Sequence, residues 1–248
     1  MHNSLDPNRW NKTKVALLKL KNDFLHLVYP EMCLICAVEL PNSKIHICHL
    51  CENSLRYTYY ESYKEPSSLD KLFWGRVKVN ATYSLLHFEK DTSTQEILHY
   101  IKYKNNIELA KEMGIRIGEK LLSNPEKFGS IDVLIPSPIH PKKRYLRGYN
   151  QSEIIANGIS KSLNIPVNTE FLTKNVHTES QTKKGRFSRW DNVVDVFNLN
   201  PEKLKNAKHI ALVDDVVTTG STLEANILKI RQALPQIEIT ILCLASTK

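Results

Sequence analysis

The stretch from Ala211 to Thr222, ALVDDVVTTGST, combines two adjacent carboxylates with a loop of hydroxyl side chains around a glycine. Carboxylates such as those of Asp214 and Asp215 accept hydrogen bonds from vicinal sugar hydroxyls, and they can hold Mg²⁺ directly or through water. The loop from Thr218 to Thr222 offers hydroxyls and backbone N–H groups to a phosphate at the start of a helix. These residue types predict a pocket for a phosphorylated sugar. An Asp-Asp turn beside a Ser/Thr helix cap is the alternative.

The elements around this stretch must bring both groups to one edge of a sheet. Residues 210–213 are aliphatic without alternation, which predicts a strand that is buried on both faces of a parallel sheet. Asp214 and Asp215 then lie at its carboxyl end, where open α/β sheets bind their ligands. We expect Gly220 to supply backbone freedom and a close approach that a Cβ atom would block.

Strand and helix patterns alternate along most of the chain. This alternation predicts an α/β fold with a doubly wound, mostly parallel sheet. The expected strands are 77–88, 131–135, 165–167, 210–213 and 237–245, and the expected helices are 94–103, 107–122, 154–163 and 224–234.

Basic residues are concentrated in two segments that precede the Asp214 strand in the sequence. The loop after strand 131–135 leaves the same sheet edge, so Pro136, Ser137 and Pro138 are candidates for holding a pyrophosphate, with a solvated proline-rich turn as the alternative. The second segment, 176–197, predicts a mobile lid, although an ordinary surface loop would have the same composition. The candidate nucleic-acid contacts are Lys142, Lys143, Arg144, Arg147, Lys183, Lys184, Arg186 and Arg189.

Four of the five cysteines form a C-x2-C-x11-C-x2-C pattern, namely Cys33, Cys36, Cys48 and Cys51. Four thiolates fill a tetrahedral Zn²⁺ site and leave no open position, so the spacing predicts a structural metal rather than a catalytic one. Disulfides are the alternative, which a reducing compartment would disfavour. We expect an amphipathic helix in residues 1–30, a small zinc-binding lobe and linker in 31–74, and the α/β domain in 75–248.

Composition and charge limit the possible partners and the cellular location of the protein. The chain has 248 residues and a formal charge of +8, from 34 Lys and Arg against 26 Asp and Glu, which suits either a polyanionic partner or simply dispersed surface lysine. No run of about 18 apolar residues is present, and the first ten residues are polar. We therefore expect no membrane span, no secretory signal and a cytoplasmic protein.

Several motifs in order resemble the ComF family: the cysteine knuckles, IKYK at 101–104, IPSPIHPKKRYLRGYNQSE at 135–153, Gln181 with Arg189 and Asn192, and VDDVVTTGST at 213–222. That family combines a zinc finger with a domain similar to type I phosphoribosyltransferases, and some members are required for DNA uptake by competent bacteria. The resemblance implies that phosphoribosyl pyrophosphate (PRPP) binds with Mg²⁺, the carboxylates of Asp214 and Asp215 taking the ribose hydroxyls. The residues implied around the 5′-phosphate are Val217, Thr218, Thr219, Gly220, Ser221 and Thr222.

Three functions follow from this resemblance. The favoured one is a PRPP-binding DNA-uptake factor that contacts single-stranded DNA and works with DNA-uptake or recombination proteins. The second is an active phosphoribosyltransferase acting on a base or amine, with Asp214, Asp215 and Arg189 as its catalytic residues. The third is a PRPP sensor whose segment 176–197 becomes ordered for a partner protein. Fold similarity alone supports the ligand site better than it supports a reaction.

Overall fold

The computed structural model describes residues 30–41, 46–90, 92–174, 197–204 and 206–247. The chain divides into two compact units, residues 1–54 and 55–248. The helix expected in residues 1–30 lies outside the described residues, apart from Pro30 at its end. In the first unit, a bridge joins Met32 to Glu39, and one short helix, α2 (His49–Asn53), follows the third cysteine.

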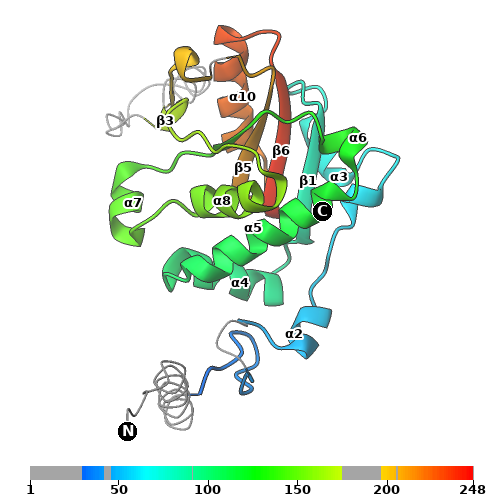
Figure 1. Cartoon of the computed structure of the whole chain (residues 1–248), viewed down its shortest axis with the longest axis vertical. Coiled ribbons are helices and arrows are strands. Elements are labelled where there is room, and N and C mark those ends of the chain that lie inside the picture. Colours follow the sequence, from blue (N-terminus) through cyan, green and yellow to red (C-terminus); the bar gives the residue numbers. More distant parts are fainter. Residues whose placement is uncertain (1–29, 42–45, 91, 175–196, 205, 248) are drawn as a thin grey trace, which may run out of the picture. The chain divides into compact units, whose positions relative to one another are not determined.

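A parallel sheet of four strands forms the core of the second unit (Figure 1). All three strand pairs are parallel, which confirms the predicted α/β fold. The two central strands are almost entirely buried, as expected of a sheet that is covered on both faces. The strand order is β1 (Ala81–His87), β6 (Glu238–Ser246), β5 (His209–Val217) and β2 (Val133–Pro136).

Four long helices connect these strands. The helix α8 leads outward from β2 to Val167, which bridges in parallel to Leu134, whereas α10 leads from β5 back to β6. Crossovers are right-handed, so two crossovers in opposite directions place their helices on opposite faces of the sheet. This arrangement confirms the doubly wound topology. The helices are α4 (Ser93–Tyr103), α5 (Ile107–Leu122), α8 (Gln151–Leu163) and α10 (Ser221–Ala233).

Two expected strands differ from the structure. In place of a strand over 165–167, only Val167 pairs with the sheet, and the strand expected over 77–88 is limited to β1. A separate antiparallel pair, β3 (Leu172–Lys174) with β4 (Phe197–Leu199), was not predicted. The remaining short helices are η1 (Tyr60–Ser62), α3 (Ser68–Phe73), α6 (Pro125–Phe128), α7 (Pro141–Arg147) and η3 (Pro201–Leu204).

The second unit begins at Leu55, so residues 55–74, which the sequence assigned to the zinc-binding lobe and linker, belong to it. Tyr57 bridges to Leu86, and the backbone N–H of Thr58 donates to the carbonyl of Leu85 at 3.1 Å. These contacts pair the segment with β1. In the described part of the chain, no helix is both long enough and apolar enough to cross a membrane.

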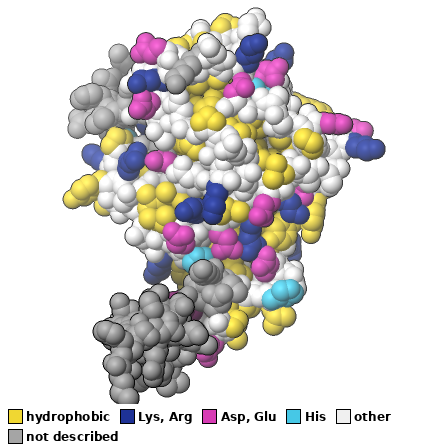
Figure 2. Space-filling model, viewed as in Figure 1, with side chains coloured by type: hydrophobic (Ala, Val, Ile, Leu, Met, Phe, Trp, Pro, Cys, Tyr) yellow, Lys and Arg dark blue, Asp and Glu magenta, His cyan; other side chains and the backbone are white. Residues whose placement is uncertain are grey.

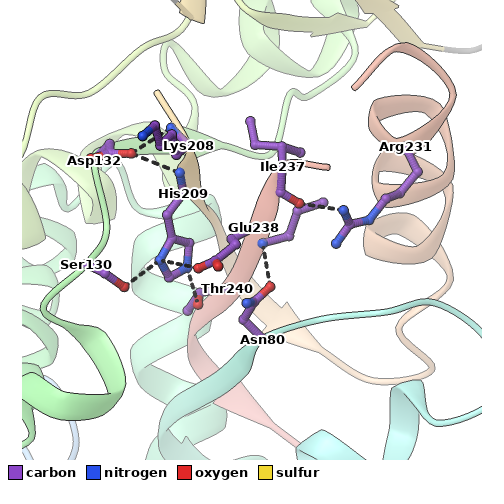
Figure 3. A network of polar contacts seen from close by, with 10 residues as sticks. Asn80, Ser130, Asp132, Lys208, His209, Arg231, Ile237, Glu238 and Thr240 are labelled. Carbon is purple, nitrogen blue, oxygen red and sulfur yellow. Dashed lines mark hydrogen bonds and ion pairs between the residues drawn. The ribbon is translucent and has the colours of Figure 1, made fainter. Parts of the chain in front are cut away.

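A polar network ties together the amino ends of the strands (Figure 3). One carboxylate oxygen of Asp132 accepts hydrogen bonds from the backbone N–H groups of Lys208 (2.7 Å) and His209 (2.8 Å). The His209 ring is paired on both sides, with the hydroxyls of Ser130 and Thr240, each at 2.8 Å. Burial lowers the pKa of His209, which favours the neutral ring, although the charges of Glu238 and Asp132 oppose the shift. The network fixes the amino edge of the sheet, which is opposite the edge where β5 leads into residues 218–222.

Candidate functional site at the carboxyl edge of the sheet

The two carboxylates lie near the end of β5. Strand β2 stops at Pro136, opposite Val213, so the residues that follow on β5 lack a neighbour from β2. The predicted strand ended at Val213, but β5 continues through Asp214 and Asp215 to Val217 because β6 pairs with it over that length. The carboxylates therefore lie beside the edge that the sequence predicts, on a regular strand instead of a turn.

Asp214 is hydrogen-bonded within the protein. Its Oδ1 atom accepts from the hydroxyl of Ser152 at 3.1 Å and from the backbone N–H of Asp215 at 2.9 Å. Burial and the charge of Asp215 raise the pKa of Asp214 to about 7, although these hydrogen bonds and the Lys102 charge oppose the shift. Asp214 thus exchanges its proton close to neutral pH, whereas an ordinary aspartate is fully ionised there.

Asp215 has a cationic partner in the protein. The Nζ atom of Lys102 lies 3.1 Å from Oδ2 of Asp215, and the two side chains are only 20% and 13% exposed. Lys102 is in the last turn of α4. The sequence contains this lysine in the IKYK segment but gives it no role, because the pairing of α4 with β5 is a property of the folded chain.

The loop after β5 leads into helix α10, whose N-terminus has no side-chain cap. The first residues of α10 have no intrahelical acceptor for their N–H groups, and the cap residue, Gly220, has no side chain to supply one. Within this loop the hydroxyls of Thr219 and Ser221 are 3.0 Å apart. The four hydroxyl residues are exposed, namely Thr218, Thr219, Ser221 and Thr222. The loop is thus accessible to an anion from solvent.

Gly220 has the predicted backbone freedom, with φ at +73°. The residue that approaches Gly220 closely is Phe73 of α3, since a Cβ atom on Gly220 would lie 3.0 Å from the Phe73 ring. The segment just after α3 holds the loop from the same side, since the Arg76 guanidinium donates to the carbonyl of Thr219 at 2.8 Å and pairs with Glu224. The glycine therefore serves packing against α3, and the hydroxyl side of the loop remains exposed.

The second predicted loop adjoins the carboxylates from β2. The backbone N–H of Ser137 donates to the carbonyl of Val213 at 2.8 Å, and the Asn150 amide donates to the carbonyl of Ser137 at 3.0 Å. The Ser137 side chain is only 3% exposed, and its hydroxyl has no hydrogen-bond partner in the described structure. Pro136 is the last residue of β2, and Pro138, which is half-buried, follows Ser137. Ser137 therefore has an unused donor close to Asp214's strand.

The basic residues Lys142 to Arg147 lie in helix α7, whereas the sequence predicted a loop here. Arg144 pairs with Glu153 at 3.3 Å, and Arg147 donates to the side-chain oxygen of Gln151 at 3.0 Å. Lys142 and Lys143 are exposed on the same helix. The predicted lid and its cations lie outside the described residues, namely Lys183, Lys184, Arg186 and Arg189.

The four cysteines of the first unit form one cluster. Their Sγ atoms all lie within 4.8 Å of one another, as four ligands of one metal ion would. Burial alone would raise the pKa of Cys33, but backbone N–H groups of Cys36, Cys48 and Ile35 lower it to about 6. Burial and the neighbouring thiols raise the pKa of Cys51. The set fits a structural Zn²⁺ ion, which would hold all four sulfurs as thiolates.

Comparison with known proteins agrees with the predicted resemblance. No protein-family model matches the chain. Competence protein F of Haemophilus influenzae is 34% identical over 93 residues, which cover 37% of this chain and 41% of that protein. The DNA utilization protein YhgH of Shigella flexneri and that of Escherichia coli K12 are each 25% identical over 225 residues, covering 88% of this chain and 98% of theirs.

The chain thus has homologues that carry the names expected for the ComF family, which confirms the resemblance drawn from its motifs. Among solved structures, AQ2163 protein from Aquifex aeolicus is 11% identical, covers 65% of this chain and 88% of its own, and has a TM-score of 0.31. That similarity is too low to inform the fold.

Proposed function

We propose that the protein binds PRPP and serves DNA uptake or DNA utilisation. The observation that carries the proposal is the position of Asp214 and Asp215 on the strand that leads directly into the open loop 218–222. Homologues named for competence and for DNA utilisation support the DNA-related role. In open α/β sheets, this edge is where ligands bind.

Each part of PRPP has a chemically matched group in the proposed site. The carboxylates accept hydrogen bonds from the ribose hydroxyls, and the N–H groups and hydroxyls of 218–222 bind the 5′-phosphate. The buried, unpartnered hydroxyl of Ser137 would donate to the pyrophosphate. Mg²⁺ would neutralise the pyrophosphate and take oxygen ligands from Asp214 or Asp215.

Single-stranded DNA is the proposed macromolecular partner. Lys142, Lys143 and Arg144 of α7 are exposed and Arg147 is half-buried, and all four follow the loop proposed for pyrophosphate. Lysine and arginine side chains on one short helix can neutralise successive phosphates, which makes the binding depend strongly on salt. The proposed contacts in the described structure are Lys142, Lys143, Arg144 and Arg147, and the proposal adds Lys183, Lys184, Arg186 and Arg189.

A phosphoribosyltransferase is the second candidate function, and one observation favours it. Transfer needs a group that takes a proton from the attacking base or amine. The sequence offers no obvious one, but the Asp214 carboxylate, which lies beside the phosphate loop and accepts from the Ser152 hydroxyl at 3.1 Å, is a candidate proton acceptor, and burial raises its pKa. Arg189 would then stabilise the departing pyrophosphate.

Thermal unfolding with ligands tests the proposal. PRPP with Mg²⁺ is expected to raise the melting temperature by several degrees when its concentration is about 100 times the dissociation constant. Ribose 5-phosphate, which lacks the pyrophosphate, is expected to give a smaller rise. An unchanged melting temperature with PRPP would refute the binding proposal, and acceptor-dependent release of pyrophosphate would favour the transferase.

A further inference from the structure

A hollow of about 550 Å³ lies between α7 and the strand β3, beside the proposed pyrophosphate loop. This volume is within the range of small-molecule sites in proteins. Pro138, Ile139 and Leu172 contribute apolar surface to its lining, and Arg144, Tyr145 and Lys174 contribute polar groups. Pro136 and Pro138 of the proposed pyrophosphate loop line it, but neither the carboxylates nor the loop 218–222 does, so its occupant adjoins the pyrophosphate and is not the ribose 5′-phosphate part of PRPP.

Helix α7 presents its side chains to solvent. None of its residues is buried, and Tyr145 and Leu146 are 90% and 81% exposed. Its ends are well formed, because the His140 ring accepts from the N–H of Lys142 and Gly148 closes the helix with φ at +78°. Figure 2 shows hydrophobic side chains protruding beside Lys and Arg side chains at the place that α7 occupies in Figure 1. A helix held in this way with an exposed tyrosine presents an aromatic ring to a ligand.

The hollow also has an unneutralised positive charge. The Lys174 Nζ atom lies 5.4 Å from the centre of the Phe197 ring, and within the described ranges no carboxylate comes within salt-bridge distance of it. Burial, together with the charge of Lys143, lowers the pKa of Lys174. Glu153 is the only acidic residue in the lining, and it already pairs with Arg144. A phosphate in the hollow would relieve the repulsion between the two lysines.

We propose that this hollow is a nucleotide subsite for single-stranded DNA, in which the ring of Tyr145 stacks on one base while Lys174 and Arg144 bind the adjoining phosphate. The inference rests on the proposed DNA contact and names the residues that carry it. Aromatic rings stack on any unpaired base, which gives affinity for single strands with little sequence preference. In a duplex the faces of the bases are already stacked, so the ring of Tyr145 has no base to meet.

The test compares Tyr145→Ala with Tyr145→Phe and Leu146→Ala, using fluorescence anisotropy of labelled oligothymidylate and of a labelled duplex of the same length. Tyr145→Ala is expected to weaken single-strand binding about fivefold or more, while duplex binding stays unchanged. Tyr145→Phe keeps the stacking ring and is expected to bind as the unaltered protein does. Leu146→Ala is the matched control, since Leu146 is also largely exposed on α7 but does not line the hollow.

The outcomes separate this inference from the broader proposal. Salt-sensitive single-strand binding that Tyr145→Ala leaves unchanged would overturn the subsite while keeping the DNA contact. No single-strand binding by the unaltered protein would overturn both, and PRPP binding would remain to be judged by itself. Tight binding of free dTMP that depends on Tyr145, with oligothymidylate binding independent of it, would assign the hollow to a mononucleotide and overturn the proposal. Because Tyr145 is almost fully exposed, its replacement leaves the fold intact.

Discussion

The ammonium group of Lys102 lies 3.1 Å from a carboxylate oxygen of Asp215 in the absence of any ligand. The pair joins α4 to β5 at the edge proposed for PRPP. Since Asp214 is the neighbouring residue, Lys102 is the cation that limits repulsion between the two carboxylates in the free protein. A Mg²⁺ ion that binds with PRPP would also reduce the repulsion between the two carboxylates. The ion pair therefore has a structural role and lies within the proposed site.

Replacing Lys102 with methionine is expected to lower the free energy of unfolding by about 1–3 kcal/mol, because a largely buried carboxylate would lose its counter-charge. Urea unfolding measures the loss. The double variant Lys102→Met with Asp215→Asn is expected to lose less than the sum of the two single changes, as contacting partners do. Strict additivity would show that the pair contributes no coupling energy.

The raised pKa of Asp214 makes stability depend on pH. In the unfolded chain its pKa returns to about 3.9, so between about pH 4 and pH 7 the folded protein binds more protons and loses stability as pH rises. Asp214→Asn removes this cost. The variant is expected to be more stable than the unaltered protein at pH 8, by on the order of 1–3 kcal/mol, with a smaller difference at pH 5.

Asp132 gives a control of opposite sign for that experiment. Backbone N–H groups of His209 and Lys208 lower the pKa of Asp132, so its ionised form stabilises the fold. Asp132→Asn is expected to destabilise the protein at pH 8 and to matter less in acid. Equal effects of Asp214→Asn at pH 5 and pH 8 in urea titrations would contradict the raised pKa of Asp214.

Gly220→Ala tests the packing of the phosphate loop against α3. The variant has a left-handed backbone at φ +73° and a Cβ atom 3.0 Å from the Phe73 ring, so a loss of about 1–3 kcal/mol is expected. Gly75→Ala is the matched control, because Gly75 has φ at +71° and nothing within 4 Å of the added carbon. Equal losses for the two variants in urea unfolding would show that the Phe73 contact costs nothing.

Much of the fold follows from local sequence patterns. Helix α5 has the predicted bounds, 107–122, because its apolar periodicity is continuous and Asn106 caps it. By contrast, the end of β5 depends on how far β6 pairs with it, and the local sequence around β5 does not predict that length. Helix α7 was missed because the preceding prolines suggested a turn, although Pro141 in the first helical turn is itself a helix-start signal.

The candidate site was only partly predictable for a similar reason. Residue types and spacing indicate the carboxylates and the hydroxyl loop, which are neighbours in the sequence. The partners of the carboxylates, Lys102 and Ser152, come from two separate helices and meet β5 only in the folded chain. Ser152 belongs to α8, which packs on β5 and also closely on α5, where a Cβ atom on Gly114 would lie 2.2 Å from the carbonyl oxygen of Ile155.

Removal of zinc is expected to unfold the first unit and to leave the second unit folded. The cysteine cluster is the main feature that joins the described parts of this unit, 30–41 and 46–54, since a lobe of this size has too little apolar core. One zinc ion per chain is expected by metal analysis, with rapid proteolysis of this region after chelation. Cys48→Ser should lose the metal, whereas Cys243→Ser, at a buried core thiol outside the cluster, should retain it. Full metal content in Cys48→Ser would contradict the four-cysteine site.

Calorimetric titration of PRPP with Mg²⁺ into the unaltered protein and into the variant Asp214→Asn with Asp215→Asn tests the central claim most directly. Saturable binding of one PRPP per chain is expected for the unaltered protein. The variant, which cannot supply carboxylates to the ribose hydroxyls, is expected to bind at least about tenfold more weakly. Equal affinity of both proteins for PRPP, or no heat of binding in either, would contradict the assignment of this sheet edge as the PRPP site.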